Sequence, residues 1–191
     1  MALHPASAQR PLPPMDVLDH ISAGIFAATM ALLFEGAPRF LGRLAVARPF
    51  GSLEHLFASA RQIAHAMPIA EQLELIDAHP RLGAPPASVS AMSFEEQGYA
   101  HDAAEQAARD AVQERARVAA ELDRLNTAYE ERFGFRYCVF VAGRARSELL
   151  AGLREALEAD RLTEIYRAID AVVDIAADRA AKLGVDPKAG A

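Results

Sequence analysis

The sequence predicts an all-α protein with a single compact multi-helix domain. Helix-forming stretches rich in Ala, Leu, Glu, Gln and Arg account for most of the 191 residues. Only one short stretch, 137–142, has the β-branched and aromatic character of a strand, and it has no partner strand. An extended linker or the start of a helix is therefore expected there. Hydrophobic residues make up 52% of the chain, which is enough to build a core.

The N-terminal part of the chain divides at Pro and Gly. Residues 1–14 contain four prolines and are expected to form a flexible arm. A first helix is expected over 15–34, ended by Gly36 and Pro38, and a short helix follows over 38–45.

The next helices are marked by their ends. Ser52 is expected to cap a helix that reaches about residue 64. Pro68 stands where another helix can begin, because the N–H that proline lacks has no helical partner at that position. This helix should end at His79-Pro80, since proline disfavours helical geometry in the preceding residue. Residues 81–92, rich in Pro, Gly and Ser, are expected to form a loop.

Long helices are expected in the C-terminal half. Ser93 opens a helical segment to about residue 132, either as one helix or as two with a break near 109–117. Two further helices are expected, over 147–159 and 163–183. They complete an expected domain over 15–185, which a tail over 186–191 follows.

Charge and cysteine content exclude several classes of protein. Twenty Lys and Arg against 26 Asp and Glu give a formal charge of −6, which argues against a nucleic-acid binder. The single cysteine, Cys138, excludes a disulfide framework, and the histidines lack metal-ligand spacing, so no metal is expected. The uncharged stretch 21–34 is 14 residues long, shorter than the roughly 20 needed to span a bilayer. No membrane partner and a cytoplasmic location are therefore expected.

His79 is the first candidate for chemistry. A helix that ends there places its carbonyl pole near the imidazole, which favours the protonated ring and predicts a raised pKa. Such a histidine beside a loop suits acid–base catalysis near neutral pH. The alternative is a polar helix stop that happens to be histidine.

Polar residues near the predicted site have both structural and functional interpretations. Ser93 and Glu96 form the Ser-x-x-Glu pattern of a helix capping box, whose first turn also offers free N–H groups to an anion. Gln97 is either a surface amide or a donor to a ligand. Arg179 lies near the buried face of the last helix and needs a partner, either a protein carboxylate or a substrate carboxylate.

Several stretches together carry a resemblance to a known family. They are FEGAPRFLGRLAVARPFGSLEHL (34–56), AHPRLG (78–83), SFEEQ (93–97), LNTAYEERFGF (125–135), VAGRARSELL (141–150) and IAADRAAKL (175–183). In this order they resemble the OHCU decarboxylase family, which acts on 2-oxo-4-hydroxy-4-carboxy-5-ureidoimidazoline. The resemblance covers about residues 16–185.

The resemblance implies an all-helical, cofactor-free, homodimeric enzyme that converts OHCU to (S)-allantoin and CO₂ during urate breakdown. It assigns catalytic roles to His79, Glu96 and Arg179, and substrate contacts to Pro80, Ser93 and Gln97. Decarboxylation leaves an electron pair that the substrate's own ring can accept, so a proton shuttle at His79 and well-placed donors suffice. Two alternatives stay open: a helical ligand-binding or dimeric interaction module, and a lyase acting on a related ureido acid.

Overall fold

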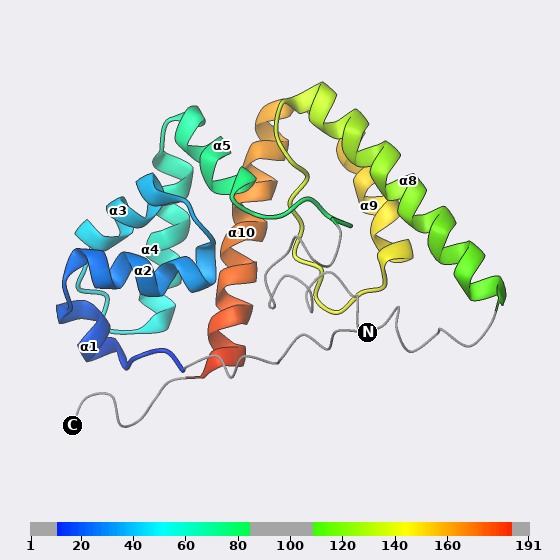
Figure 1. The fold of residues 1–191 in the computed structure, drawn as a ribbon. Coiled ribbons are helices and arrows are strands. Elements are labelled where there is room, and N and C mark those ends of the chain that lie inside the picture. The colour runs from blue at the N-terminus through cyan, green and yellow to red at the C-terminus, as the bar shows by residue number, and fades with distance from the viewer. Residues whose placement is uncertain (1–10, 85–108, 185–191) are drawn as a thin grey trace.

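The computed structural model describes residues 11–84 and 109–184, and these fold into eight α-helices with no β-strand (Figure 1). The predicted all-α class is confirmed for this part of the chain. The helices are α1 (Met15–His20), α2 (Ala23–Phe34), α3 (Pro38–Val46), α4 (Leu53–Ala66), α5 (Ile69–Asp77), α8 (Arg109–Phe133), α9 (Arg146–Glu158) and α10 (Arg161–Leu183).

Helix α10 runs through the middle of the molecule. Figure 1 shows α1 to α5 on one side of it and α8 with α9 on the other. It packs against α2, α4 and α5, while α8 packs along α9. Its buried residues Ile165, Ile169, Val172 and Ala176 recur at helical spacing, so they form one apolar stripe toward the core. Asp160 caps the helix by accepting hydrogen bonds from the first backbone N–H groups.

The prediction of a single helix over 15–34 is wrong, because α1 ends at His20 and α2 begins at Ala23. The Ser22 hydroxyl accepts the Ile25 N–H at 3.3 Å and starts α2 as a separate helix. The carbonyls that α1 leaves open at Leu18 and Ile21 are bound by the Arg48 guanidinium at 2.9 and 2.7 Å. Arg48, which is distant in the sequence, thus stabilises the C-terminal end of α1.

Residues 11–14, the last part of the segment expected to form a flexible arm, join the domain at Leu12. Leu12 is fully buried in the core, and its N–H donates to the Gly184 carbonyl at 2.9 Å. Residues 11–14 therefore pack with the end of α10, while 1–10 and 186–191 lie outside the described residues.

The segment after α8 is extended, as the sequence indicates, but pairs with no strand in the part of the chain described. Gly134 has φ +77°, a left-handed conformation that lets the chain leave α8 sharply. Phe135, Tyr137 and Val141 then enter the core. Helix α8 is continuous from Arg109, so no break falls within 110–117. Among the helices described here, none is long and apolar enough to cross a membrane.

Candidate active site

The site is built around the turn that follows α5. As predicted, the helix ends before Pro80: the Ala78 N–H donates to Glu74 and the His79 N–H to Ile76, which closes the last turn. Pro80 itself is half-buried beside His79. Helix α5 packs on α10, so the turn faces the central helix.

His79 is buried, with 5% of its surface exposed. Neither ring nitrogen makes a hydrogen bond to the part of the chain that the structure describes. Burial and the nearby Arg179 guanidinium lower the pKa of His79 to about 3, and the Leu75 backbone carbonyl only partly opposes them. The raised pKa predicted from the helix end is therefore wrong. The helix carbonyl acts in the expected direction, but desolvation and a neighbouring cation outweigh it.

Arg179 lies on the buried face of α10, as predicted, and is 1% exposed. Its Nη1 donates to the Leu33 carbonyl at 3.0 Å, and its Nη2 lies 3.0 Å from Glu35 Oε1. The guanidinium therefore has a protein carboxylate partner at the end of α2. That carboxylate belongs to the 34–56 stretch of the resemblance, but no functional signal in the sequence singled it out.

Two of the predicted catalytic side chains are thus brought together from positions 100 residues apart in the chain. The imidazole is neutral at physiological pH, and an anionic ligand beside it would offset the Arg179 charge and raise its pKa toward the range that suits proton transfer. A buried guanidinium can balance the charge of such a ligand. Glu96, Ser93 and Gln97 lie outside the described residues.

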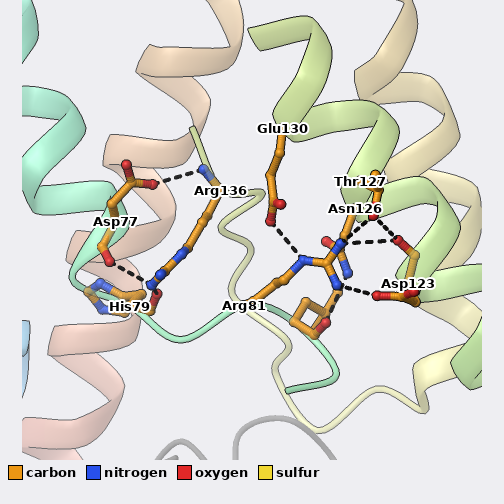
Figure 2. A network of polar contacts seen from close by, with 9 residues as sticks. Asp77, His79, Arg81, Asp123, Asn126, Thr127, Glu130 and Arg136 are labelled. Atoms are coloured by element: carbon orange, nitrogen blue, oxygen red, sulfur yellow. Dashed lines mark hydrogen bonds and ion pairs between the residues drawn. The ribbon is translucent and has the colours of Figure 1, made fainter. Parts of the chain in front are cut away.

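Residues on either side of His79 fix the turn, and sequence reasoning assigned them no role. Figure 2 shows Arg136 on one side of the turn and Arg81, with its partners on α8, on the other. Arg81 and its partner Glu130 fall within stretches that carry the family resemblance, but only the folded chain shows that they meet. Within the described residues, no group of three His, Cys, Asp or Glu side chains is placed to hold a metal ion.

The fold and the site define a helical protein with a buried imidazole beside a buried arginine, suited to a small anion. The family model of OHCU decarboxylase matches residues 19–181. The chain therefore belongs to the OHCU decarboxylase family.

Relatives from bacteria, archaea and animals agree with this. The chain is 30% identical over 169 residues to the uric acid degradation bifunctional protein PucL of Bacillus subtilis, covering 88% of this chain and 32% of that protein. It thus spans about a third of the bifunctional relatives' length. It is 26% and 28% identical to 2-oxo-4-hydroxy-4-carboxy-5-ureidoimidazoline decarboxylases of Haloferax volcanii and Amia calva, covering 82% and 84% of this chain and 88% and 89% of theirs.

Solved structures share the fold. A crystal structure of OHCU decarboxylase in the presence of (S)-allantoin matches with a TM-score of 0.60 at 23% identity, covering 82% of this chain and 96% of that one. A crystal structure of (S)-allantoin synthase matches with a TM-score of 0.62 at 19% identity, covering 91% and 54%.

Proposed function

We propose that this protein decarboxylates OHCU to (S)-allantoin in urate degradation. The observation that carries the proposal is the buried, neutral His79 beside the buried Arg179, in a chain that belongs to the OHCU decarboxylase family. The names of the Haloferax and Amia relatives support the same substrate.

The reaction requires little beyond proton transfer and positioning. The bond between the ring carbon C4 and the carboxylate carbon breaks, CO₂ leaves, and the electron pair passes into the ring. Protonation of the neighbouring ring carbon, with conversion of the C4 hydroxyl to a carbonyl, completes allantoin. One proton is taken up for each carboxylate lost, so the charges balance.

His79 suits the role of proton shuttle in this scheme. The imidazole is neutral before substrate binds, and the negative charge of the bound substrate would raise its pKa, so that it can take the C4 hydroxyl proton and then return a proton to one face of the planar intermediate. Delivery to a single face accounts for formation of one enantiomer. Arg179 would balance the negative charge of the substrate while its carboxylate is still attached.

The remaining predicted residues complete the proposed site. Glu96 would orient the imidazole or the substrate, and Ser93 and Gln97 would bind the polar edge of the substrate. Pro80 would keep the turn outside helical geometry, so that His79 faces the site. We further propose that the enzyme works without a cofactor, as a homodimer in the cytoplasm.

The activity is tested by generating OHCU in situ from urate with urate oxidase and hydroxyisourate hydrolase. Addition of this protein should give rapid, enantiopure allantoin, followed by circular dichroism. A matched control is Arg43→Met, which removes an exposed bidentate contact to Glu71 on α5 and should retain the wild-type rate. Slow formation of racemic product at the rate of the blank would refute the proposal. Sedimentation equilibrium tests the homodimer separately.

A further inference from the structure

Arg136 holds the upstream side of the His79 turn. Its Nη1 donates to the Asp77 carbonyl at 2.8 Å and to the His79 carbonyl at 3.1 Å. Its own backbone N–H donates to the Asp77 carboxylate at 2.8 Å. One residue from the segment after α8 therefore binds the last carbonyl of α5 and the carbonyl of His79 in the turn that follows (Figure 2).

Arg81 holds the downstream side of the turn through helix α8. Its Nε donates to Glu130 at 2.7 Å, and its Nη atoms donate to the Asp123 carboxylate, the Asp123 carbonyl and the Thr127 hydroxyl. The buried Asn126 adds a bond from its Nδ2 to the Leu82 carbonyl at 2.9 Å. In Figure 2 the Arg81 side chain and the His79 ring leave the turn in opposite directions.

These contacts matter because nothing in the described structure orients the imidazole by a hydrogen bond to the ring. The direction of the ring therefore depends on its packing and on the backbone of residues 77–82. A displacement of a reacting group by about 1 Å can reduce the rate about 10²-fold. The groups that hold this backbone are thus placed to control catalysis without touching the substrate.

We propose that Arg136 and Arg81 are positioning residues, which clamp the His79–Pro80 turn from both sides and direct the imidazole toward Arg179. The inference rests on the proposed function. Arginine suits both positions better than lysine, because its planar fork of fixed donors can bind two or more acceptors at once, whereas a flexible lysine ammonium replaces only part of these contacts.

The test compares Arg136→Met and Arg81→Met with Arg124→Met. Arg124 is an exposed arginine of α8 that, among the described residues, pairs with the half-buried Glu121 and makes no contact with the turn. Each clamp variant should lower kcat about 10- to 100-fold, with KM close to that of the wild type, because binding groups remain while the shuttle is displaced. The control should keep the wild-type kcat. Arg136→Lys should recover part of the loss, and it replaces Arg136→Met if the latter does not fold.

A second measurement does not need the substrate. The ring ¹³C and ¹⁵N shifts of His79, followed by NMR against pH, should show no titration between pH 5 and 8 in the wild type. In the clamp variants the turn loosens and water reaches the ring, so the pKa of His79 should move up toward its ordinary value of about 6.5.

Combination with His79→Asn shows whether the arginines act through His79. The loss caused by each arginine variant should vanish in the His79→Asn background. An equal loss in that background, or a wild-type kcat with an unchanged His79 titration, overturns the inference. If the wild type fails to decarboxylate OHCU, the proposed function fails, while the NMR titration still decides the positioning role.

Discussion

Helix α10 carries two buried charged side chains, Glu164 and Arg179, whose surroundings differ. The Glu164 carboxylate accepts the Tyr129 hydroxyl at 2.8 Å and the Arg167 guanidinium at 2.9 and 3.1 Å. Arg167 also donates to the Cys138 carbonyl and stacks over the Tyr137 ring at 4.7 Å. This cluster links α10 to α8 and to the extended segment, and its carboxylate is well supplied with donors.

Around Arg179, fewer of the buried polar atoms have hydrogen-bond partners among the described residues. The arginine binds Leu33 and Glu35, but it faces His79, whose two buried ring nitrogens have no hydrogen bond among the described residues. A buried polar atom without a partner costs about 1–3 kcal/mol, so its presence requires an explanation. The matched cluster of Glu164, Arg167 and Tyr129 therefore serves stability, whereas the unmatched imidazole of His79 is available to a ligand.

The pKa values of the side chains that surround Glu164 are consistent with a structural role. Burial, with the adjacent Glu164 carboxylate, raises the pKa of the Tyr129 hydroxyl above its usual range. Burial by itself lowers the pKa of Arg167, but the hydrogen bond to Glu164 and the charges of Glu164, Tyr137 and Tyr129 together raise it above its ordinary value, so the guanidinium stays charged. Neither group changes charge near neutral pH, as expected of a structural link.

The largest expected effect is on catalysis at the site of His79 and Arg179. His79→Asn should lower the rate of OHCU decarboxylation about 10²- to 10⁴-fold, since general acid–base catalysis contributes that range. The midpoint of denaturation should change little, because the ring makes no hydrogen bond within the described chain. A coupled circular-dichroism assay and urea unfolding measure the two quantities. A near-native rate with a single allantoin enantiomer would contradict the role given to His79.

The next effect concerns stability at the matched cluster. Glu164→Ala should lower the free energy of unfolding by about 3–5 kcal/mol, because it removes the acceptor of both the buried Tyr129 hydroxyl and the half-buried Arg167 guanidinium. Activity per folded molecule should persist, since Glu164 lies about 22 Å from Arg179 along the helix axis at 1.5 Å per residue. Urea unfolding tests the first statement and the decarboxylase assay the second. Glu131→Ala, an exposed carboxylate on α8, is the control.

A smaller loss is expected from Tyr129→Phe. This change removes one hydrogen bond to Glu164 but leaves the ion pair with Arg167 and the aromatic contacts to Phe133 and Phe135. A hydrogen bond to a charged group is worth about 1.5–3 kcal/mol, so urea unfolding should report a loss in that range. A loss as large as that of Glu164→Ala would show that the hydroxyl, rather than the ion pair, holds the cluster together.

The smallest expected effect is a pH dependence of stability. The pKa of His79 is lowered in the folded state to about 3, so between that pH and about 6.5 the unfolded chain binds the proton and the folded chain does not. Stability should therefore fall as the pH drops below 6.5, by at most about 1.4 kcal/mol per unit. His79→Asn should remove this contribution. Urea midpoints of both proteins from pH 8 to 5 give the difference, and parallel curves would contradict the lowered pKa.

Several features of the fold and site could be predicted from the sequence because they depend on local rules. Helix-forming composition gives the all-α class, and Pro80 disfavours helical geometry in the residue before it, so α5 ends ahead of His79. Helical spacing likewise places Arg179 on the buried face of α10. Each of these depends on residues within a few positions of one another.

Other features depend on contacts that only the folded chain creates. The charge state expected for His79 was wrong because burial and a guanidinium from 100 residues away outweigh the local helix end. The Glu35 partner of Arg179 and the two arginines that hold the turn come from distant segments. Local propensity therefore determined which helices form and where the key side chains stand, whereas tertiary packing decided their charge and their partners, because desolvation and Coulomb interactions act through space.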